Sequence, residues 1–351
     1  MSVPPIVDYL VRAGHAAPSA DNAQPWRFDW DGRLLRVSVE AARLDPRVFD
    51  RDSPAVGITL GAVAENMLQA AEAAGLEPEL ELMPEQMAFQ LLLPPSLLEA
   101  APPAELPRAL QARHTNRLPF LPDPLPQAMA EGLARSSEGS ARPLLVTEAA
   151  SLRRLAQLVE QASRLRFQTR HIHEWFARSL RFAPEQVAAG DGLDVATFDL
   201  PPGGRLLLRL VSDWRRMVFL NRFGFHRLFA AIEAQPVRKA PAVLLISAAA
   251  GRQASFDAGR LMERIWLDLN RQGIAVQPYY VLPDQLDRLR RGALDAPHRQ
   301  RMLAVEAELQ RCVRLEGRKL LMMLRIGRPR CQAVRARRLP LEVVFKGKDS
   351  T

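Results

Sequence analysis

Apolar positions recur along the chain at the spacing of amphipathic helices or in the alternation typical of strands. Ile6, Leu10 and Ala13 lie on one face of a first helix. Gly75 follows a second, longer helical stretch, at the position where a left-handed helix cap is expected. For the first part of the chain, the pattern predicts helices over about 5–16 and 56–74 and strands over 34–39 and 89–93.

Prolines then dominate residues 94–126, where a regular helix or central strand is excluded, apart from a short helix at about 108–113. We interpret this stretch as a connection between two halves. In the second half, the 178–235 stretch is helical only in part, and 320–326 is a core strand or a helix end. The other predicted elements are helices over about 125–136, 149–177, 214–234 and 256–272 and strands over 144–146 and 241–246.

The two long helical stretches resemble each other. Gly61 precedes Gly75 by the same interval at which Gly259 precedes Gly273. Glu65 and Glu263 each stand four residues after the opening glycine, and a proline follows both cap glycines. These matches predict a tandem duplication whose two copies pack as a homodimer does, which makes the chain a pseudo-dimer. We expect a first half over 1–100 and a second half over 101–351, with an insertion at about 164–235.

Composition and charge narrow the class of protein. The chain has 351 residues, 48% hydrophobic and 25% charged, which excludes a disordered chain. The two cysteines are too few for a disulfide framework, and the lack of a long apolar run or of a secretion signal favours a cytoplasmic protein. The net charge of +9 comes from arginine. It reflects an arginine-rich composition, an anionic partner such as nucleic acid, or a phosphate ligand.

Three segments carry candidate chemistry. The loop APSADNAQPWRF (17–28) offers hydroxyl, carboxylate and amide groups, as either an ordinary surface turn or a ligand-binding loop. The segment RHTNRLPF (113–120) places two arginines and a hydroxyl where they could bond a phosphate, or forms a solvated basic turn. The segment RARRLPLEVVF (335–345) joins three arginines to an apolar run that a disordered tail would lack.

These three segments resemble motifs of the nitroreductase superfamily of flavoproteins, and in particular its fused two-copy Acg-like and MoeY-like branches. The resemblance implies an α+β fold: a three-layer α/β sandwich, duplicated in tandem. It also implies one FMN per chain, bound between the halves. FMN would then pass electrons from NAD(P)H to a nitro, quinone or other conjugated small-molecule acceptor.

The resemblance also assigns residues to FMN. Arg113, Thr115 and Arg117 would hold the phosphate and ribityl chain, and Arg337 and Arg338 would join them at the phosphate. From the first half, the loop would contribute Ser19, Asn22 and Gln24. In the stretch VQPYYVLP, Pro278 and Tyr280 match the part of the family sequence that lines the flavin ring.

Other functions remain alternatives at this point. The insertion, rich in aromatic residues, could cover the flavin, which would make the chain an FMN-sequestering protein with little turnover. A basic protein that binds nucleic acid or another anion is a third hypothesis. His171 and His173 point to different faces of a helix, so we expect no metal. No dinucleotide fingerprint or P-loop occurs, and we assign no catalytic residue. We expect no nucleic acid or membrane partner, and a monomeric pseudo-dimer or weak homodimer.

Overall fold

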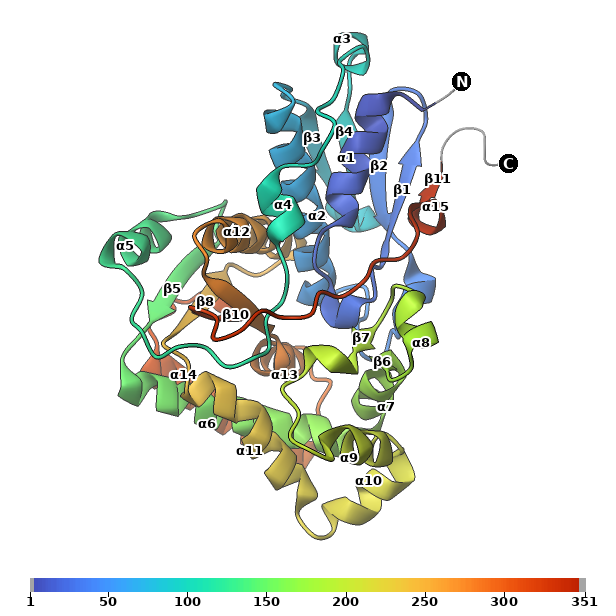
Figure 1. Cartoon of the computed structure of the whole chain (residues 1–351). Helices are drawn as coiled ribbons and strands as arrows, with labels where there is room; N and C mark the ends of the chain where they lie inside the picture. The colour runs from blue at the N-terminus through green and yellow to red at the C-terminus, as the bar shows by residue number, and fades with distance from the viewer. Residues whose placement is uncertain (1–2, 347–351) are drawn as a thin grey trace.

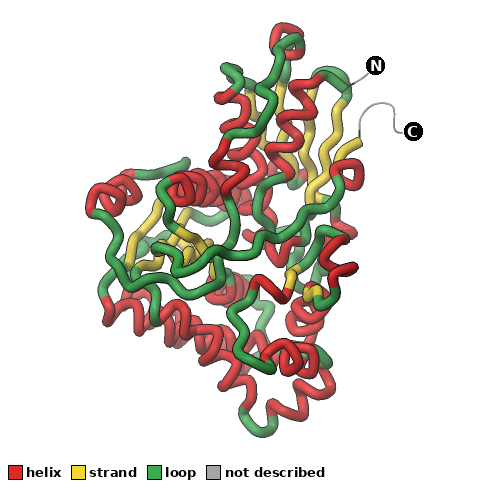
Figure 2. Tube along the Cα trace, in the orientation of Figure 1, coloured by secondary structure: helices red, strands yellow, loops and turns green. Residues whose placement is uncertain are grey.

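The computed structural model describes residues 3–346 and has an α+β architecture built around two mainly antiparallel sheets (Figures 1 and 2). The first sheet has the strand order β11-β1-β2-β4-β3, and the second has the order β5-β8-β10-β9. The α+β class is therefore confirmed. The strands are β1 (Trp26–Trp30), β2 (Leu34–Val39), β3 (Glu79–Met83), β4 (Ala88–Leu92), β5 (Arg142–Val146), β6 (Leu180–Arg181), β7 (Leu193–Asp194), β8 (Ala242–Ala248), β9 (Ala275–Tyr279), β10 (Lys319–Gly327) and β11 (Phe345–Lys346).

Helices pack on these sheets and fill the space between them. Those of the first half and of the connection are α1 (Pro5–His15), α2 (Pro54–Ala73), α3 (Pro95–Leu98) and α4 (Arg108–Ala112). Those of the second half are α5 (Gln127–Arg135), α6 (Ala149–Gln168), α7 (Arg170–Ser179), α8 (Pro184–Ala188), α9 (Gly204–Val211), α10 (Trp214–Asn221), α11 (Phe225–Arg238), α12 (Arg252–Arg271), α13 (Val281–Arg290), α14 (Ala296–Cys312) and α15 (Leu341–Val344).

Two predicted helices are each divided in two. The stretch 149–177 breaks at Thr169, where the backbone is extended. The Thr169 hydroxyl donates to the Leu165 carbonyl, so α6 ends there and α7 begins at the next residue. The stretch 214–234 breaks at Gly224, where φ is +84°, a conformation that glycine adopts without steric cost. The connection 94–126 holds the short helix α3 besides the predicted α4, because Pro95 stands at the first helical turn, where proline is tolerated.

Helices α2 and α12 pack against each other at the centre of the molecule (Figure 1). Both have 20 residues, and Gly61 and Gly259 occupy the eighth position of each. A Cβ on Gly61 would lie 2.0 Å from the Phe256 carbonyl oxygen, and a Cβ on Gly259 would lie 2.1 Å from that of Ile58. The two helices therefore approach backbone to backbone through reciprocal contacts.

The two sheets also share a plan. In each half, a helix, two strands, a 20-residue helix and two more strands follow in order, and the strands take equivalent places in the sheet. The second half adds α6–α11 between β5 and β8, and α13–α14 between β9 and β10. One hydrophobic core joins α1, α2 and α12 to both sheets, so the halves form one packed body.

The end of the chain returns to the first half. After β10, residues 328–340 run across the molecule, and β11 pairs in parallel with β1 at the edge of the first sheet (Figure 1). Phe28 is aligned with Phe345 in this pairing. The closing basic segment is thereby brought beside the loop that connects α1 to β1.

Candidate functional site

The loop after α1 has an irregular backbone fixed by its own side chains. Asp21, Asn22 and Gln24 all have positive φ angles of 50–56°. The Ser19 hydroxyl accepts a hydrogen bond from the Gln24 amide at 2.9 Å, and the Gln24 side-chain amide donates to the Asn22 carbonyl at 3.1 Å. Three of the four residues 21–24 thus have a left-handed backbone, and the side-chain amides of Asn22 and Gln24 point toward the returning C-terminal segment.

The C-terminal segment is bound to this loop along its length. The Gln24 Oε1 accepts from the Leu339 amide at 3.0 Å, and the Asn22 Nδ2 donates to the Arg337 carbonyl at 3.0 Å. Trp26 donates to His15 Nδ1 at 3.0 Å, so His15 donates through Nε2 to the Leu339 carbonyl at 2.8 Å. Burial lowers the pKa of His15 to about 4, which keeps this linking imidazole neutral at physiological pH.

Two of the predicted arginines converge on one carbonyl oxygen. Arg113 and Arg338 both donate through Nη2 to Ala16, at 2.8 and 3.1 Å. Arg338 also donates through Nη1 to the Asn22 Oδ1 at 2.6 Å. Three segments that are distant in the sequence therefore meet here. The side chain of the neighbouring Arg337 is exposed instead.

A buried carboxylate, Glu263, lies within this cluster. Its Oε1 is 3.0 Å from the Arg113 Nε, and Arg113 also stacks over Trp266 with 4.9 Å to the ring centroid. Burial raises the pKa of Glu263 to about 7, against the pull of Arg113 and Arg338. Burial and the charge of Arg113 lower the pKa of Arg338 to about 9. The cluster thus carries an excess of positive charge that is poorly solvated.

The remaining predicted residues lie around the end of β9. Thr115 forms a parallel bridge with Val276, and Pro278 is paired with Leu324 within the second sheet. Tyr280 follows at the start of α13, where burial and Asp284 raise its pKa. Arg117 donates to the Thr197 hydroxyl at 3.1 Å and stacks over Phe198, with its pKa lowered by burial.

The insertion covers the candidate residues directly. The Gly190 carbonyl accepts from the Gln24 Nε2 at 2.9 Å and from the Asn22 Nδ2 at 3.3 Å. Trp175 donates to the Asp21 carboxylate at 2.7 Å, and Thr197 is the partner of Arg117. There is no room for a side chain at position 190, because a Cβ on Gly190 would lie 2.0 Å from the Arg338 carbonyl oxygen.

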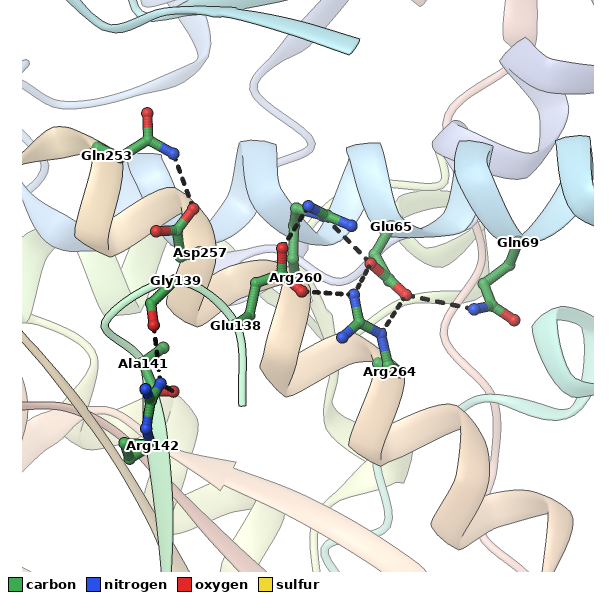
Figure 3. Close-up of polar contacts among 10 residues, drawn as sticks. All are labelled: Glu65, Gln69, Glu138, Gly139, Ala141, Arg142, Gln253, Asp257, Arg260 and Arg264. Carbon is green, nitrogen blue, oxygen red and sulfur yellow. Dashed lines mark hydrogen bonds and ion pairs between the residues drawn. The ribbon is translucent and has the colours of Figure 1, made fainter. Parts of the chain in front are cut away.

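A second polar cluster occupies the equivalent place on the partner helix. Glu65 stands at the same position of α2 as Glu263 in α12. Arg264 contacts Glu65 and Glu138 at 2.8 Å each, and Arg260 bridges the same two carboxylates (Figure 3). Glu138 lies in the loop between α5 and β5, the counterpart of the loop after α1. Two guanidinium groups and two carboxylates make this cluster neutral.

Sequence reasoning missed Glu263 and Asp21 as members of the site. The signal for Glu263 was the repeat itself, which matched this carboxylate to Glu65. For Asp21, the signal was its place in the candidate loop. Within residues 3–346, no group of three or more His, Cys, Asp or Glu residues could hold a metal ion, and no helix is long and apolar enough to span a membrane.

Comparison with known proteins gives limited similarity. No family model matches the chain. Uncharacterized protein MT1398 of Mycobacterium tuberculosis is 26% identical over 287 residues, which cover 78% of this chain and 38% of that protein. The chain thus spans well under half the length of this curated relative.

Several solved structures are similar in part. The FMN-dependent nitroreductase NfnB of Mycobacterium smegmatis, in complex with NADPH, is 21% identical, with 68% of this chain and 96% of that chain covered and a TM-score of 0.38. An FMN-bound nitroreductase of Bacteroides fragilis is 14% identical, with coverages of 65% and 94% and a TM-score of 0.32. NfrA2 of B. megaterium is 11% identical, with coverages of 70% and 74% and a TM-score of 0.38. TM-scores this low do not establish a common fold.

Proposed function

We propose that the chain is an FMN-dependent oxidoreductase of nitroreductase type, which passes electrons from NAD(P)H to a nitro, quinone or other conjugated acceptor. The observation that carries this proposal is the meeting of the three motif segments around the Ala16 carbonyl. Arg113, Arg338 and Asn22 come from three separate parts of the chain, and a chance set of surface turns would have no reason to converge. The convergence agrees with the arrangement that the resemblance implies.

The arginine cluster suits a phosphate. Arg113 and Arg338 bring two positive charges, and the neighbouring Glu263 has a pKa raised to about 7, so part of its charge is already lost near neutral pH. The buried Arg113 Nε and both oxygens of Glu263 make no hydrogen bond of good geometry. An anion beside the guanidinium groups would accept hydrogen bonds from them and offset the excess positive charge.

In this proposal each segment holds a different part of FMN. Arg113, Arg338 and, at the edge, Arg337 would hold the phosphate, with Thr115 and Arg117 along the ribityl chain. From the first half, the loop would contribute Ser19, Asn22 and Gln24, with Pro278 and Tyr280 near the ring. When bound, FMN would supply the two-electron chemistry, while these residues bind it, orient it and exclude water.

The repeated architecture supports a diverged tandem duplication with a single site. The halves share strand order, helix length and the reciprocal glycine contacts of Gly61 and Gly259. Around Glu263 the charges are unbalanced, whereas around Glu65 two arginines face two carboxylates (Figure 3). A neutral network offers little to a phosphate, so we place one FMN in each chain, between the halves.

Binding and turnover are tested separately. The purified protein is titrated with FMN and with riboflavin, and bound FMN is then exposed to NADH or NADPH without oxygen. We expect FMN to bind much more tightly than riboflavin, and its visible absorbance band to be bleached when the flavin is reduced. Equal affinity for the two flavins would exclude the phosphate site, and tight binding without bleaching would exclude the reductase.

A second candidate function is FMN sequestration with little turnover. Contacts from the insertion favour it, because Gly190, Trp175 and Thr197 all bond to candidate site residues. A segment held in this way would restrict the access of NAD(P)H and acceptor to the flavin face.

The glycine at position 190 offers a test of this covering segment. In Gly190→Ala, the new Cβ collides with the Arg338 backbone and should displace the segment, which should raise the rate of nitroaromatic reduction if FMN is retained. Gly203→Ala is the matched control, because Gly203 has a similar φ of +78° and no atom within 4 Å of the new Cβ. Fast reduction by the wild type, with small and bulky acceptors alike, would rule out sequestration.

A further inference from the structure

Helices α9, α10 and the first turns of α11 form a tip at one end of the molecule, remote from the first sheet (Figure 1). Leu206 is 72% exposed and Phe223 is 69% exposed, values unusual for large apolar side chains. Apolar residues exposed together mark interaction surfaces on soluble domains. We define the tip patch as the exposed apolar residues Leu206, Leu207, Leu210, Val218, Phe219, Phe223, Leu228 and Ile232.

The tip patch is not a by-product of packing the insertion. In α9 the buried residues are Gly204 and Val211, and in α10 the buried residue is Met217. These two short helices therefore direct more large apolar side chains outward than inward. Their outward faces need another apolar medium to cover them.

Positive charge surrounds the tip patch. Between residues 204 and 229 the sequence has six arginines, whereas its one acidic residue is Asp213. The Asp213 carboxylate caps α10 by accepting from the Arg216 amide at 2.9 Å. The arginines, all exposed, are Arg205, Arg209, Arg215, Arg216, Arg222 and Arg227.

A cationic cavity opens beside the tip patch. Its volume is about 230 Å³, and it lies between α6, α11 and α14. Arg227 and Arg301 line it together with His226 and with Arg164, which is ion-paired with Glu160 of α6 at 2.5 Å. Since Arg227 precedes Leu228 of the tip patch, anionic and apolar parts of one ligand could be held side by side.

We propose that the tip docks on the surface of an anionic lipid bilayer. In this arrangement Leu206, Phe219 and Phe223 enter the boundary between headgroups and acyl chains, the arginines contact lipid phosphates, and the cavity holds one phosphate. Interfacial helices of this kind combine an apolar face with flanking cations. A second copy of the chain fits less well, because a two-fold contact through the tip would set arginines against arginines. The proposal goes beyond the flavin chemistry, does not depend on it, and departs from the expectation of no membrane partner.

Vesicle co-sedimentation of the full chain tests the proposal. Vesicles of phosphatidylglycerol and phosphatidylcholine in equal parts are compared with vesicles of phosphatidylcholine alone. We expect binding to the anionic vesicles at 0.1 M salt to exceed binding to the neutral ones at least tenfold, because both charge and apolar insertion contribute.

Two pairs of variants assign the binding to the tip. Phe219→Glu combined with Phe223→Glu should lower binding to anionic vesicles at least tenfold, whereas Leu303→Glu, at an exposed apolar residue of α14, should not. Arg215→Glu combined with Arg216→Glu should also lower it, whereas Arg33→Glu, in the β1–β2 turn, should not. All four are surface changes, and thermal unfolding confirms that each protein is folded.

Four outcomes would overturn the proposal. The first is that the protein binds neither the anionic nor the neutral vesicles, and the second is that it binds both equally. The third is that both tip variants bind anionic vesicles as well as the wild type does, and the fourth is that the control variants lose as much binding as the tip variants. Analytical ultracentrifugation tests whether a second copy of the chain covers the tip instead. If the wild type is a dimer, the Phe219→Glu/Phe223→Glu variant is a monomer, and neither binds vesicles, the tip is a contact between copies of the chain.

Discussion

At the scale of single residues, the Ala16 carbonyl is the point where the candidate site is assembled. It accepts from both Arg113 and Arg338, and these arginines approach from opposite ends of the second half. These hydrogen bonds hold both guanidinium groups in place, so their positions are fixed before any ligand binds. Such preorganisation lowers the entropic cost of binding a phosphate.

Removal of the Arg113 side chain should weaken FMN binding by about ten- to a hundredfold, because a charge-assisted hydrogen bond contributes about 1.5–3 kcal/mol. Riboflavin, which lacks the phosphate, should bind the Arg113→Ala variant and the wild type alike. Arg337→Ala is the comparison variant: its side chain is exposed at the edge of the cluster, so its loss should weaken FMN binding less than Arg113→Ala does. Fluorescence titration measures both affinities, with thermal unfolding measured in parallel because Arg113→Ala leaves Glu263 without its cation.

If Arg113→Ala and Arg337→Ala weaken FMN binding equally, the phosphate is not held by the buried cluster. If neither changes it, the arginines serve the fold alone.

Glu263 gives the site a dependence of stability on pH. Burial raises its pKa in the folded chain to about 7, from an ordinary value of 4.5. The folded state therefore keeps the proton where the unfolded state releases it. This contribution to stability is complete below about pH 4.5 and is lost as pH rises toward 7.

Relative to Glu263→Gln, the wild type should therefore lose free energy of unfolding between pH 5 and pH 8. Urea denaturation of both proteins at the two pH values measures the difference, in which the other titrating groups cancel. A constant difference, or one that grows in favour of the wild type at pH 8, would contradict the raised pKa.

At the scale of elements, the α2–α12 pair determines how the halves meet. Helices approach this closely only where a residue without a side chain faces the other backbone. Gly61 provides this in α2, and Gly259 provides it in α12. Gly259→Ala should destabilise the chain by at least about 1–3 kcal/mol, because backbone atoms of Ile58 cannot move aside as a flexible side chain would.

The control is Gly132→Ala in α5, where nothing lies within 4 Å of the new Cβ. Alanine in a helix is more favourable than glycine by about 0.5–1 kcal/mol, so this variant should be as stable as the wild type or more so. Equal effects of the two substitutions in urea denaturation would show that the helices do not meet through Gly259.

For the molecule as a whole, the proposed duplication would leave two equivalent places, of which the one at Glu263 carries excess positive charge. Denaturing release and flavin quantitation should therefore give one FMN per chain, in a chain that need not dimerise to bind it. Loss of the Glu65 charge in Glu65→Gln should leave this ratio unchanged, since the network around Glu138 is not a phosphate site. Two flavins per chain would refute the diverged-duplicate argument.

The elements whose signal is local could be predicted from the amino-acid sequence. Hydrophobic spacing suffices for α1, and together with a following glycine it suffices for α2 and α12. Alternation suffices for β2, whose predicted bounds are those observed. Helices α13 and α14, by contrast, were not predicted. Their apolar residues form a recognisable helical face only when the packing of both helices against α6 is known. Local periodicity does not distinguish a covered helix from a loop where charged residues interrupt it.

For the candidate site, the sequence supplied the three motif segments and the repeat, because residue type and spacing are local properties. Long-range contacts determine that Arg338 and not Arg337 enters the cluster and that Glu263 is its counter-charge. They also place the Gly190 carbonyl against Asn22 and Gln24. These outcomes depend on contacts between segments far apart along the chain. A side chain's partner is set by where the backbone returns, and that path is fixed by the packing of both halves around α2 and α12.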